Sequence, residues 1–271
     1  MTITRQAYAK HDFIRTSIDL LCAGVSWRGG KFIAHNSNLQ AKILPTTDDA
    51  FLEQVAKSML LDGQAFIEVS NAEGKLGITQ ITAPAASKVG IIITIERVES
   101  SFSPKAEPIL ERVGSHIELY EKAHEQLATN SVAVELLSYA LPAIHTALAI
   151  PSSMLDQSRF AQMPVEALMM GAIQYQSEVR QLRHNLRFGM NQVGNLVGEK
   201  LEIDYVSWEW NDEWITEGPC KYGHVYQIFQ LKGINLTPIM NSELGGMKLA
   251  VQAGLISNRT YAECAESYGV K

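Results

Sequence analysis

Hydrophobic residues that recur at steps of three and four predict two helices near the start of the chain. The first is broken by Gly24 and again at 29–30, and the second follows capping residues at 46–49 and ends at 62–63. The apolar side of the first helix consists of Ile14, Ile18, Leu21 and Val25, and that of the second consists of Phe51, Leu52, Val55, Met59 and Leu60.

The spacing then changes to that of β-strands. Residues 65–69 and 76–81 flank a turn cluster at 71–74, so we expect them to pair as a hairpin. The β-branched run at 91–95 predicts a third strand. The N-terminal part is therefore expected to combine helices with a small antiparallel sheet.

The middle of the chain returns to a helical pattern. A helix over 105–127 is predicted, with an apolar seam beside a stripe of glutamates. Residues 132–148 are apolar almost all round, which predicts a helix that is buried on most sides and kinked at Pro142. The seam consists of Leu110, Val113, Ile117, Tyr120, His124 and Leu127, and the stripe consists of Glu107, Glu111, Glu118, Glu121 and Glu125.

A longer helical pattern follows a polar stretch at 152–162. It covers 164–197, with Pro164 suited to the first turn. Gly194 and Gly198 bracket its predicted end.

The remaining residues predict a strand over 201–210 and two helices around Gly254. The fold class that follows is α+β, predominantly helical.

Composition and charge narrow the possible functions. With 271 residues, 46% of them hydrophobic, the chain is long enough for one large or two small domains with a real core. Its formal net charge of -6 gives it no basic footprint for gripping nucleic acid. Cys22, Cys220 and Cys264 are odd in number and far apart, which favours a reducing compartment over a disulfide framework or a zinc knuckle.

The chain is not expected to enter a membrane. Its N-terminus lacks the charged and apolar regions of a signal peptide. The longest apolar run, 132–150, is interrupted by Glu135, Pro142 and His145, and a charge at mid-bilayer costs roughly 2.5 to 3.5 kcal/mol. A helix buried in protein is the favoured interpretation.

Motifs of common enzymes are missing from the sequence. It contains no GxxxxGK[ST], GxGxxG, HExxH, GxSxG or CxxC, so we expect no catalytic residues and no cofactor. His116 and His124 are poorly spaced for a metal site. A carboxylate group at Glu118, Glu121 and Glu125 could bind a divalent cation, but a solvated or channel-facing acidic stripe is favoured. An alternative hypothesis is an enzyme of an unfamiliar type whose metal site is formed by the glutamates and histidines of this helix.

Basic residues gather on the long helix. Arg180, Arg183, His184 and Arg187 have spacings that place them on one side. A solvated face or a row of salt bridges between subunits is favoured, and contact with phosphates is the alternative.

Three short segments carry a resemblance to a known family. They read LLDGQAFIEV at 60–69, ALAIPSSML at 147–155 and GLISNRT at 254–260. In this order they resemble segments of the portal proteins of tailed bacteriophages, which have a strand like "LLxGNAYI" after a helix, a helix ending in "GVPxxLL", and a "GxxS/TxxT" helix junction. Ala149 stands where the second pattern has glycine.

The resemblance implies a portal-like architecture. Residues 1–103 would be the N-terminal wing with its small sheet, 104–150 a stem-like pair of helices, and 151–163 a tunnel-like loop. Residues 164–271 would supply the long wing helix, a strand and a crown-like helical end. The clip is reduced or absent, because only residues 128–131 separate the two stem-like helices.

The function that the resemblance implies is a ring, commonly of twelve subunits, at a capsid vertex of the virion, assembled in the host cytoplasm. Double-stranded DNA would pass through it during packaging and ejection. Its other partners would be further copies of the chain, the major capsid protein, neck or adaptor proteins and, transiently, the terminase.

A DNA conduit should hold its cargo weakly, because each neutralised phosphate adds affinity. The glutamates could instead pair with Arg180, Arg183 or Arg187 of a neighbouring subunit. A different class of function is a homo-oligomeric virion scaffold or adaptor without DNA passage. The side chains expected at the channel are Glu111, Glu118, Glu121, Glu125, Ser152, Ser153, Gln157 and Arg159.

Overall fold

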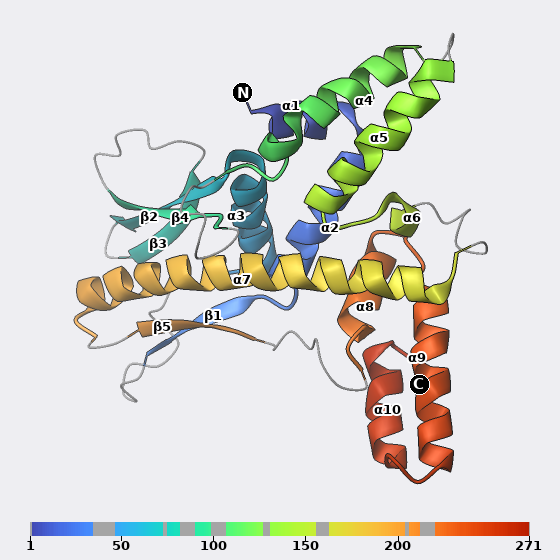
Figure 1. The fold of residues 1–271 in the computed structure, drawn as a ribbon. Coiled ribbons are helices and arrows are strands. Elements are labelled where there is room, and N and C mark those ends of the chain that lie inside the picture. Colours follow the sequence, from blue (N-terminus) through green and yellow to red (C-terminus); the bar gives the residue numbers. More distant parts are fainter. Residues whose placement is uncertain are drawn as a thin grey trace. The chain divides into compact units, whose positions relative to one another are not determined.

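A computed structural model shows an α+β protein that is predominantly helical (Figure 1). Its contacts divide the chain into two compact units, which are described separately below. Unit 1 comprises Met1–Gly114 and Val179–Glu213, and unit 2 comprises Ser115–Glu178 and Trp214–Lys271. No helix among the described residues has both the length and the hydropathy needed to cross a membrane. The structure describes residues 2–34, 47–72, 75–81, 90–98, 107–126, 131–155, 163–203, 206–211 and 220–270.

Unit 1 begins with α1 (Ile3–Lys10), α2 (Asp12–Ser26) and α3 (Asp49–Asp62). Both helices predicted in this region are confirmed. The predicted break at Gly24 is wrong, because this glycine lies buried inside α2, where tertiary packing offsets its low helix propensity. The start and end of α3 follow the predicted signals: Asp48 accepts a hydrogen bond from the Phe51 amide at 2.7 Å, and Gly63 takes φ 76° at the C-terminal end.

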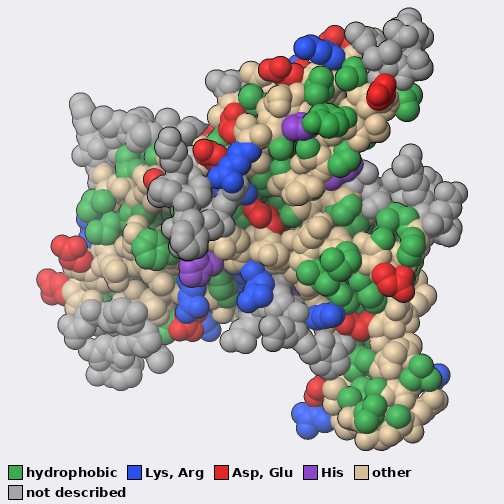
Figure 2. Space-filling view, viewed as in Figure 1, with side chains coloured by type: hydrophobic (Ala, Val, Ile, Leu, Met, Phe, Trp, Pro, Cys, Tyr) green, Lys and Arg blue, Asp and Glu red, His purple; other side chains and the backbone are tan. Residues whose placement is uncertain are grey.

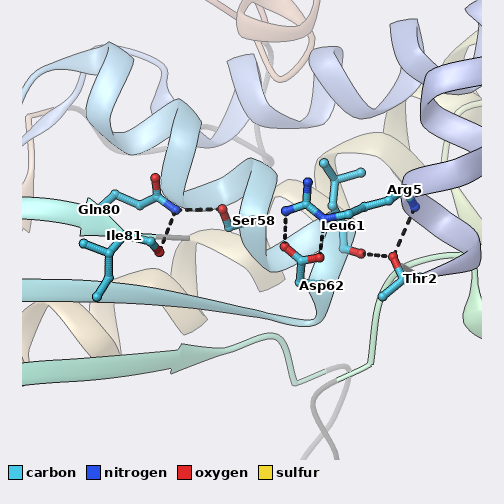
Figure 3. A network of polar contacts seen from close by, with 7 residues as sticks. All are labelled: Thr2, Arg5, Ser58, Leu61, Asp62, Gln80 and Ile81. Carbon is cyan, nitrogen blue, oxygen red and sulfur yellow. Dashed lines mark hydrogen bonds and ion pairs between the residues drawn. The ribbon is translucent and has the colours of Figure 1, made fainter. Parts of the chain in front are cut away.

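Polar contacts tie α1 and a strand to α3 (Figure 3). The guanidinium of Arg5 pairs with the carboxylate of Asp62, and the Thr2 hydroxyl donates to the Leu61 carbonyl at 2.8 Å. On the other side, the Gln80 amide donates to the Ser58 hydroxyl at 2.9 Å. Helix α3 is therefore the element around which the N-terminal part of unit 1 is organised.

The larger sheet has the order β3-β2-β4, and all its pairings are antiparallel. Its strands are β2 (Gln64–Ala72), β3 (Lys75–Ile81) and β4 (Gly90–Glu96). The predicted hairpin and third strand are both confirmed. Alternate residues of the central strand β2, Ala65, Ile67 and Val69, are fully buried.

A second sheet pairs β1 (Gly30–Ala34) with β5 (Val206–Trp210), also antiparallel. The sequence did not predict β1, and the strand expected over 201–210 is shorter than predicted. A Cβ atom at Gly30 would lie 2.0 Å from the Trp208 ring, so only glycine fits there. This close approach lets a fully buried tryptophan lie directly against the partner strand.

The long helix α7 (Val165–Leu201) continues past its predicted end. Gly194 and Gly198 are inside it, and each allows a close approach to unit 1 backbone. A Cβ atom on Gly194 would lie 2.7 Å from the Val206 carbonyl oxygen, and one on Gly198 would lie 2.9 Å from that of Ile203. The two glycines therefore allow close packing inside α7 and do not end the helix.

Unit 2 contains α5 (Ser131–Ala147) and α6 (Ser152–Leu155), and nearly all of α4 (Gly114–Gln126). Helix α4 starts later than the predicted residue 105, after a 3-10 turn at Glu111–Val113. The preceding backbone has tertiary partners instead: the Ile109 amide donates to the Leu60 carbonyl, and the Leu110 amide donates to the Thr4 hydroxyl.

The C-terminal part of unit 2 consists of α8 (Gly223–Leu231), α9 (Thr237–Gln252) and α10 (Asn258–Ser267). The two helices predicted around Gly254 are confirmed, and α8 was not predicted. Tyr175 on the first part of α7 contacts Phe229 of α8 edge to face, with ring centroids 5.1 Å apart. Both rings are fully buried, so the pair is part of the unit 2 core.

Candidate assembly surfaces

Helix α4 carries the acidic face that the sequence predicted, which we define as Glu118, Glu121 and Glu125. Glu118 and Glu125 are exposed, and Glu121 is half-buried. The exposed Lys122 lies among them on the same helix. The face is therefore acidic but not uniformly so, and it presents less negative charge than the glutamates alone suggested.

The apolar seam of α4 differs from the prediction at one position. Ile117, Tyr120 and Ala123 are buried, whereas His124 is exposed and contacts the Tyr120 ring at its edge. Leu127 lies outside the described residues. The sequence predicted that the next buried residue after Tyr120 would be His124, four residues later. In the structure it is the smaller Ala123, three residues later.

Glu111 precedes the acidic face and has a role inside unit 1. Its carboxylate accepts a hydrogen bond from the Ile3 amide at 3.1 Å, at the N-terminus of α1. Negative charge is stabilising there, because the first amides of a helix point outward. Glu107 forms an ion pair with Arg112 at 2.9 Å. These carboxylates have partners within the chain.

Helix α5 is exposed where burial was predicted. Val134 is 63% exposed and Tyr139 is 67% exposed, so the expectation of burial on most sides is wrong for the single chain. Its inner side is made of Ala133, Ala140, Ile144 and Leu148. Figure 2 shows hydrophobic side chains gathered over the α4–α5 pair.

A shallow cavity of about 390 Å³ opens on the outer side of α5. It is lined by Glu135, Leu136, Ser138 and Tyr139. The ring of Tyr139 stacks on His116 of α4, with centroids 5.5 Å apart. Because it is open to solvent, the cavity suits a protruding side chain of another protein better than an enclosed small molecule.

His145 lies on the same helix and is mostly buried. Burial lowers its pKa to about 4, so the imidazole is neutral near pH 7. The inner side of α5 therefore contributes no positive charge to the neighbouring acidic face.

The sequence predicted that the basic residues of α7 share one side of the helix. In the structure they do not. Arg180, His184 and Arg187 are exposed, but Arg183 is only 4% exposed. Its guanidinium carbon lies 3.9 Å from the centroid of the Trp210 ring, in unit 1. Arg183 is therefore buried against Trp210 in the single chain, whereas the other three basic residues are exposed.

The exposed basic strip of α7 is accordingly Arg180, His184 and Arg187, followed by Phe188. Phe188 is 66% exposed. On the inner side of the helix, Gln181 and Asn185 donate hydrogen bonds to the Val98 carbonyl at 3.0 and 2.9 Å. These bonds fix the rotation of the helix and keep the basic strip turned outward.

The tunnel-like loop is only partly described. Ser152 and Ser153 belong to the short helix α6, and Gln157 and Arg159 lie outside the described residues. A Cβ atom on Gly171 of α7 would lie 2.5 Å from the Met154 sulfur, so this glycine allows α6 to pack against α7. Just before α6, Ala149 adopts φ 53°, a left-handed conformation.

The hairpin of α9 and α10 exposes apolar side chains that the sequence analysis did not single out. Leu249 is 67% exposed and Leu255 is 77% exposed, and both lie near the turn at Gly254 in the sequence. A Cβ atom added at Gly245 or Gly246, in the middle of α9, would meet no atom from another part of the described chain within 4 Å. The sequence signal that could have indicated this surface is a leucine on each side of Gly254, the glycine that follows α9.

The described residues contain no group of three or more His, Cys, Asp or Glu side chains arranged to hold a metal ion. Within that part of the chain, neither the His116 and His124 pair nor the three glutamates of the acidic face are arranged as a metal site. The described surface therefore combines charged strips on α4 and α7 with exposed apolar side chains on α5 and near the α9–α10 turn.

No model of a protein family matches the chain, and no curated protein matches it.

Proposed function

We propose that this chain is the subunit of a portal-like ring, which forms the conduit for double-stranded DNA at a capsid vertex. The observation that carries the proposal is the backbone at the three segments that resemble portal proteins. Each segment has a left-handed residue after a helix, with φ 76° at Gly63, 53° at Ala149 and 73° at Gly254.

These are the three positions at which the family patterns have glycine. A left-handed residue at the end of a helix favours glycine, because a Cβ atom is disfavoured in that conformation. Ala149 departs from the pattern in sequence but adopts the same backbone conformation. All three positions therefore have a backbone conformation that favours glycine, which supports the proposal.

The order of elements supports the same proposal. The antiparallel helices α4 and α5 would be the stem-like pair, residues 151–163 the tunnel-like loop, and the 37-residue helix α7 the wing helix. Helices α9 and α10 would form the crown-like end. The partners would be other copies of the chain, DNA, the major capsid protein, neck or adaptor proteins and the terminase.

Exposed apolar side chains give a reason for self-assembly. Val134 and Tyr139 on α5, and Leu249 and Leu255 near the α9–α10 turn, are mostly exposed in the single chain. Each subunit of a ring has two neighbours that make unlike contacts, so separate surfaces of one chain can be covered at once. Burial of such side chains is a main driving force for association.

The charge distribution suits a conduit. A net charge of -6 and exposed glutamates on α4 would repel the phosphates of a duplex, whose passage requires weak attachment. In the alternative arrangement, Glu118 and Glu125 pair with Arg180 and Arg187 of a neighbouring subunit. The two arrangements differ in what a charge reversal does.

The test is the double variant Glu118→Lys and Glu125→Lys, because both side chains are exposed. The conduit arrangement predicts that rings assemble normally but retain double-stranded DNA at low salt. The interface arrangement predicts that assembly fails, as measured by sedimentation, and that Arg180→Glu with Arg187→Glu restores it. Assembly without any gain in DNA retention would contradict both arrangements.

The matched control is Glu199→Lys with Glu266→Lys. Both glutamates are exposed in the last turns of α7 and α10, where a lysine suits the helix dipole. This control changes the net charge equally and should alter neither assembly nor DNA retention.

A second candidate is a homo-oligomeric virion scaffold or adaptor without DNA passage. The exposed Lys122 among the glutamates of α4 favours it, because this charge weakens the repulsion of DNA. The second candidate predicts a closed assembly in which a duplex is neither enclosed nor released by salt.

A further inference from the structure

Helix α8 packs against α10 in unit 2, and the contact repeats along both segments. A Cβ atom on Gly223 would lie 2.4 Å from the Ser267 hydroxyl oxygen. The rings of Tyr226 and Tyr268 meet edge to face, with centroids 5.2 Å apart. The side-chain amide of Gln227 donates to the Ser267 carbonyl. The two segments are thus held closely together.

The same contact brings two cysteines together. Cys220 lies three residues before Gly223, and Cys264 lies three residues before Ser267. Each thiol affects the pKa of the other, as expected of side chains that lie close together. Cys264 is fully buried, whereas Cys220 is partly exposed. The pair could not be predicted from the sequence, because 43 residues lie between the two cysteines.

We propose that Cys220 and Cys264 form an intramolecular disulfide under oxidising conditions, which links the turn before α8 to α10. The oxidant would be a small disulfide such as oxidised glutathione. This inference does not depend on the proposed function, because it concerns contacts within one chain.

The exchange proceeds in two steps. The partly exposed Cys220 loses its proton, and its sulfur attacks one sulfur of glutathione disulfide, releasing one glutathione as the thiolate. The sulfur of Cys264, also deprotonated, then attacks the Cys220 sulfur and releases the second glutathione. Two protein thiols are oxidised by two electrons, the glutathione disulfide is reduced to two thiols, and the two protons remain with the products.

The surroundings make this reaction slow at neutral pH. Burial raises the pKa of both thiols, and the carboxylates of Glu243 on α9 and Glu263 on α10 raise that of Cys220 further. Tyr268 also faces the pair and donates a hydrogen bond to Glu243. Because the thiolate is the attacking species, the rate should increase with pH well above 8.

The experiment uses the full chain, folded and reduced, with oxidised glutathione at about pH 9, above the ordinary thiol pKa. We expect two of the three thiols to be lost and no glutathione to remain attached. Peptide mapping without reductant should join the peptides of Cys220 and Cys264. The melting temperature should increase by roughly 5 °C or more, since the bridge closes a long loop.

Two variants separate the pair from the third cysteine. Cys22→Ala removes the buried thiol of α2 and should leave the cross-link unchanged. Cys220→Ala changes a partly exposed position and should abolish the cross-link while the protein stays folded. Three free thiols after prolonged oxidation, glutathione retained on Cys220, or a cross-link between chains would each overturn the proposal.

Discussion

Ala149 is the residue whose backbone conformation gives the clearest prediction. It is a non-glycine residue with φ 53° between α5 and α6. Replacing it with glycine should increase the free energy of unfolding by about 0.5 kcal/mol, because relief of the left-handed strain exceeds the added freedom of the unfolded chain. Denaturation in urea measures this difference.

The control is Ala262→Gly, at an exposed position inside α10. It should lower stability by about 1 kcal/mol, the usual effect of glycine in a helix. Equal losses for both variants would contradict the left-handed assignment of Ala149.

Arg183 gives a second prediction at this scale. Its guanidinium is buried over the Trp210 ring, so Arg183→Ala should lower stability by about 2 kcal/mol through lost packing and cation–π attraction. Arg180→Ala, one turn earlier and exposed, should change stability by less than about 0.5 kcal/mol. If the two substitutions had equal effects on thermal or urea unfolding, Arg183 would have to be a surface residue.

At the scale of elements, local signals determined what the sequence could predict. Helix α3 was predicted from the capping residue Asp48 at its start and Gly63 at its end, and the hairpin from its turn cluster. The end of α7 was mispredicted because Gly194 and Gly198 pack against a distant backbone, which no local pattern records.

The candidate surfaces follow the same rule. The exposure of Glu118 and Glu125 follows from the helical repeat of α4. The burial of Arg183 does not, because it depends on Trp210, which the fold brings beneath α7. The exposure of the leucines near Gly254 could not be predicted either, since apolar residues are ordinarily expected in the interior.

Helix α5 should make stability depend on pH through His145. Burial holds its pKa near 4, below the ordinary 6.5, so the unfolded chain binds more protons between these values. The stabilisation is complete above pH 6.5 and is lost as the pH falls toward 4. With allowance for partial exposure, we expect a loss of about 2 kcal/mol over this range.

The measurement is urea unfolding of the chain and of His145→Gln at several pH values between 4 and 7. The variant lacks the titrating group and should show a smaller decrease in stability as the solution is acidified. An unchanged slope would mean that other groups, such as the many carboxylates, account for the whole dependence.

The proposed ring requires the association of identical chains. The single chain exposes apolar side chains on α5 and near the α9–α10 turn, together with acidic and basic strips on α4 and α7. Unlike surfaces on one subunit can join head to tail, which closes into a ring when the rotation between neighbours allows it.

Electron microscopy of the purified assembly tests this claim most directly. The account predicts rings with a central opening of roughly 20 Å or more, wide enough for a duplex whose major groove alone is about 12 Å wide. It also predicts that Glu118 and Glu125 line that opening or the contact between neighbouring subunits. Monomers, or small closed particles without an opening, would contradict it.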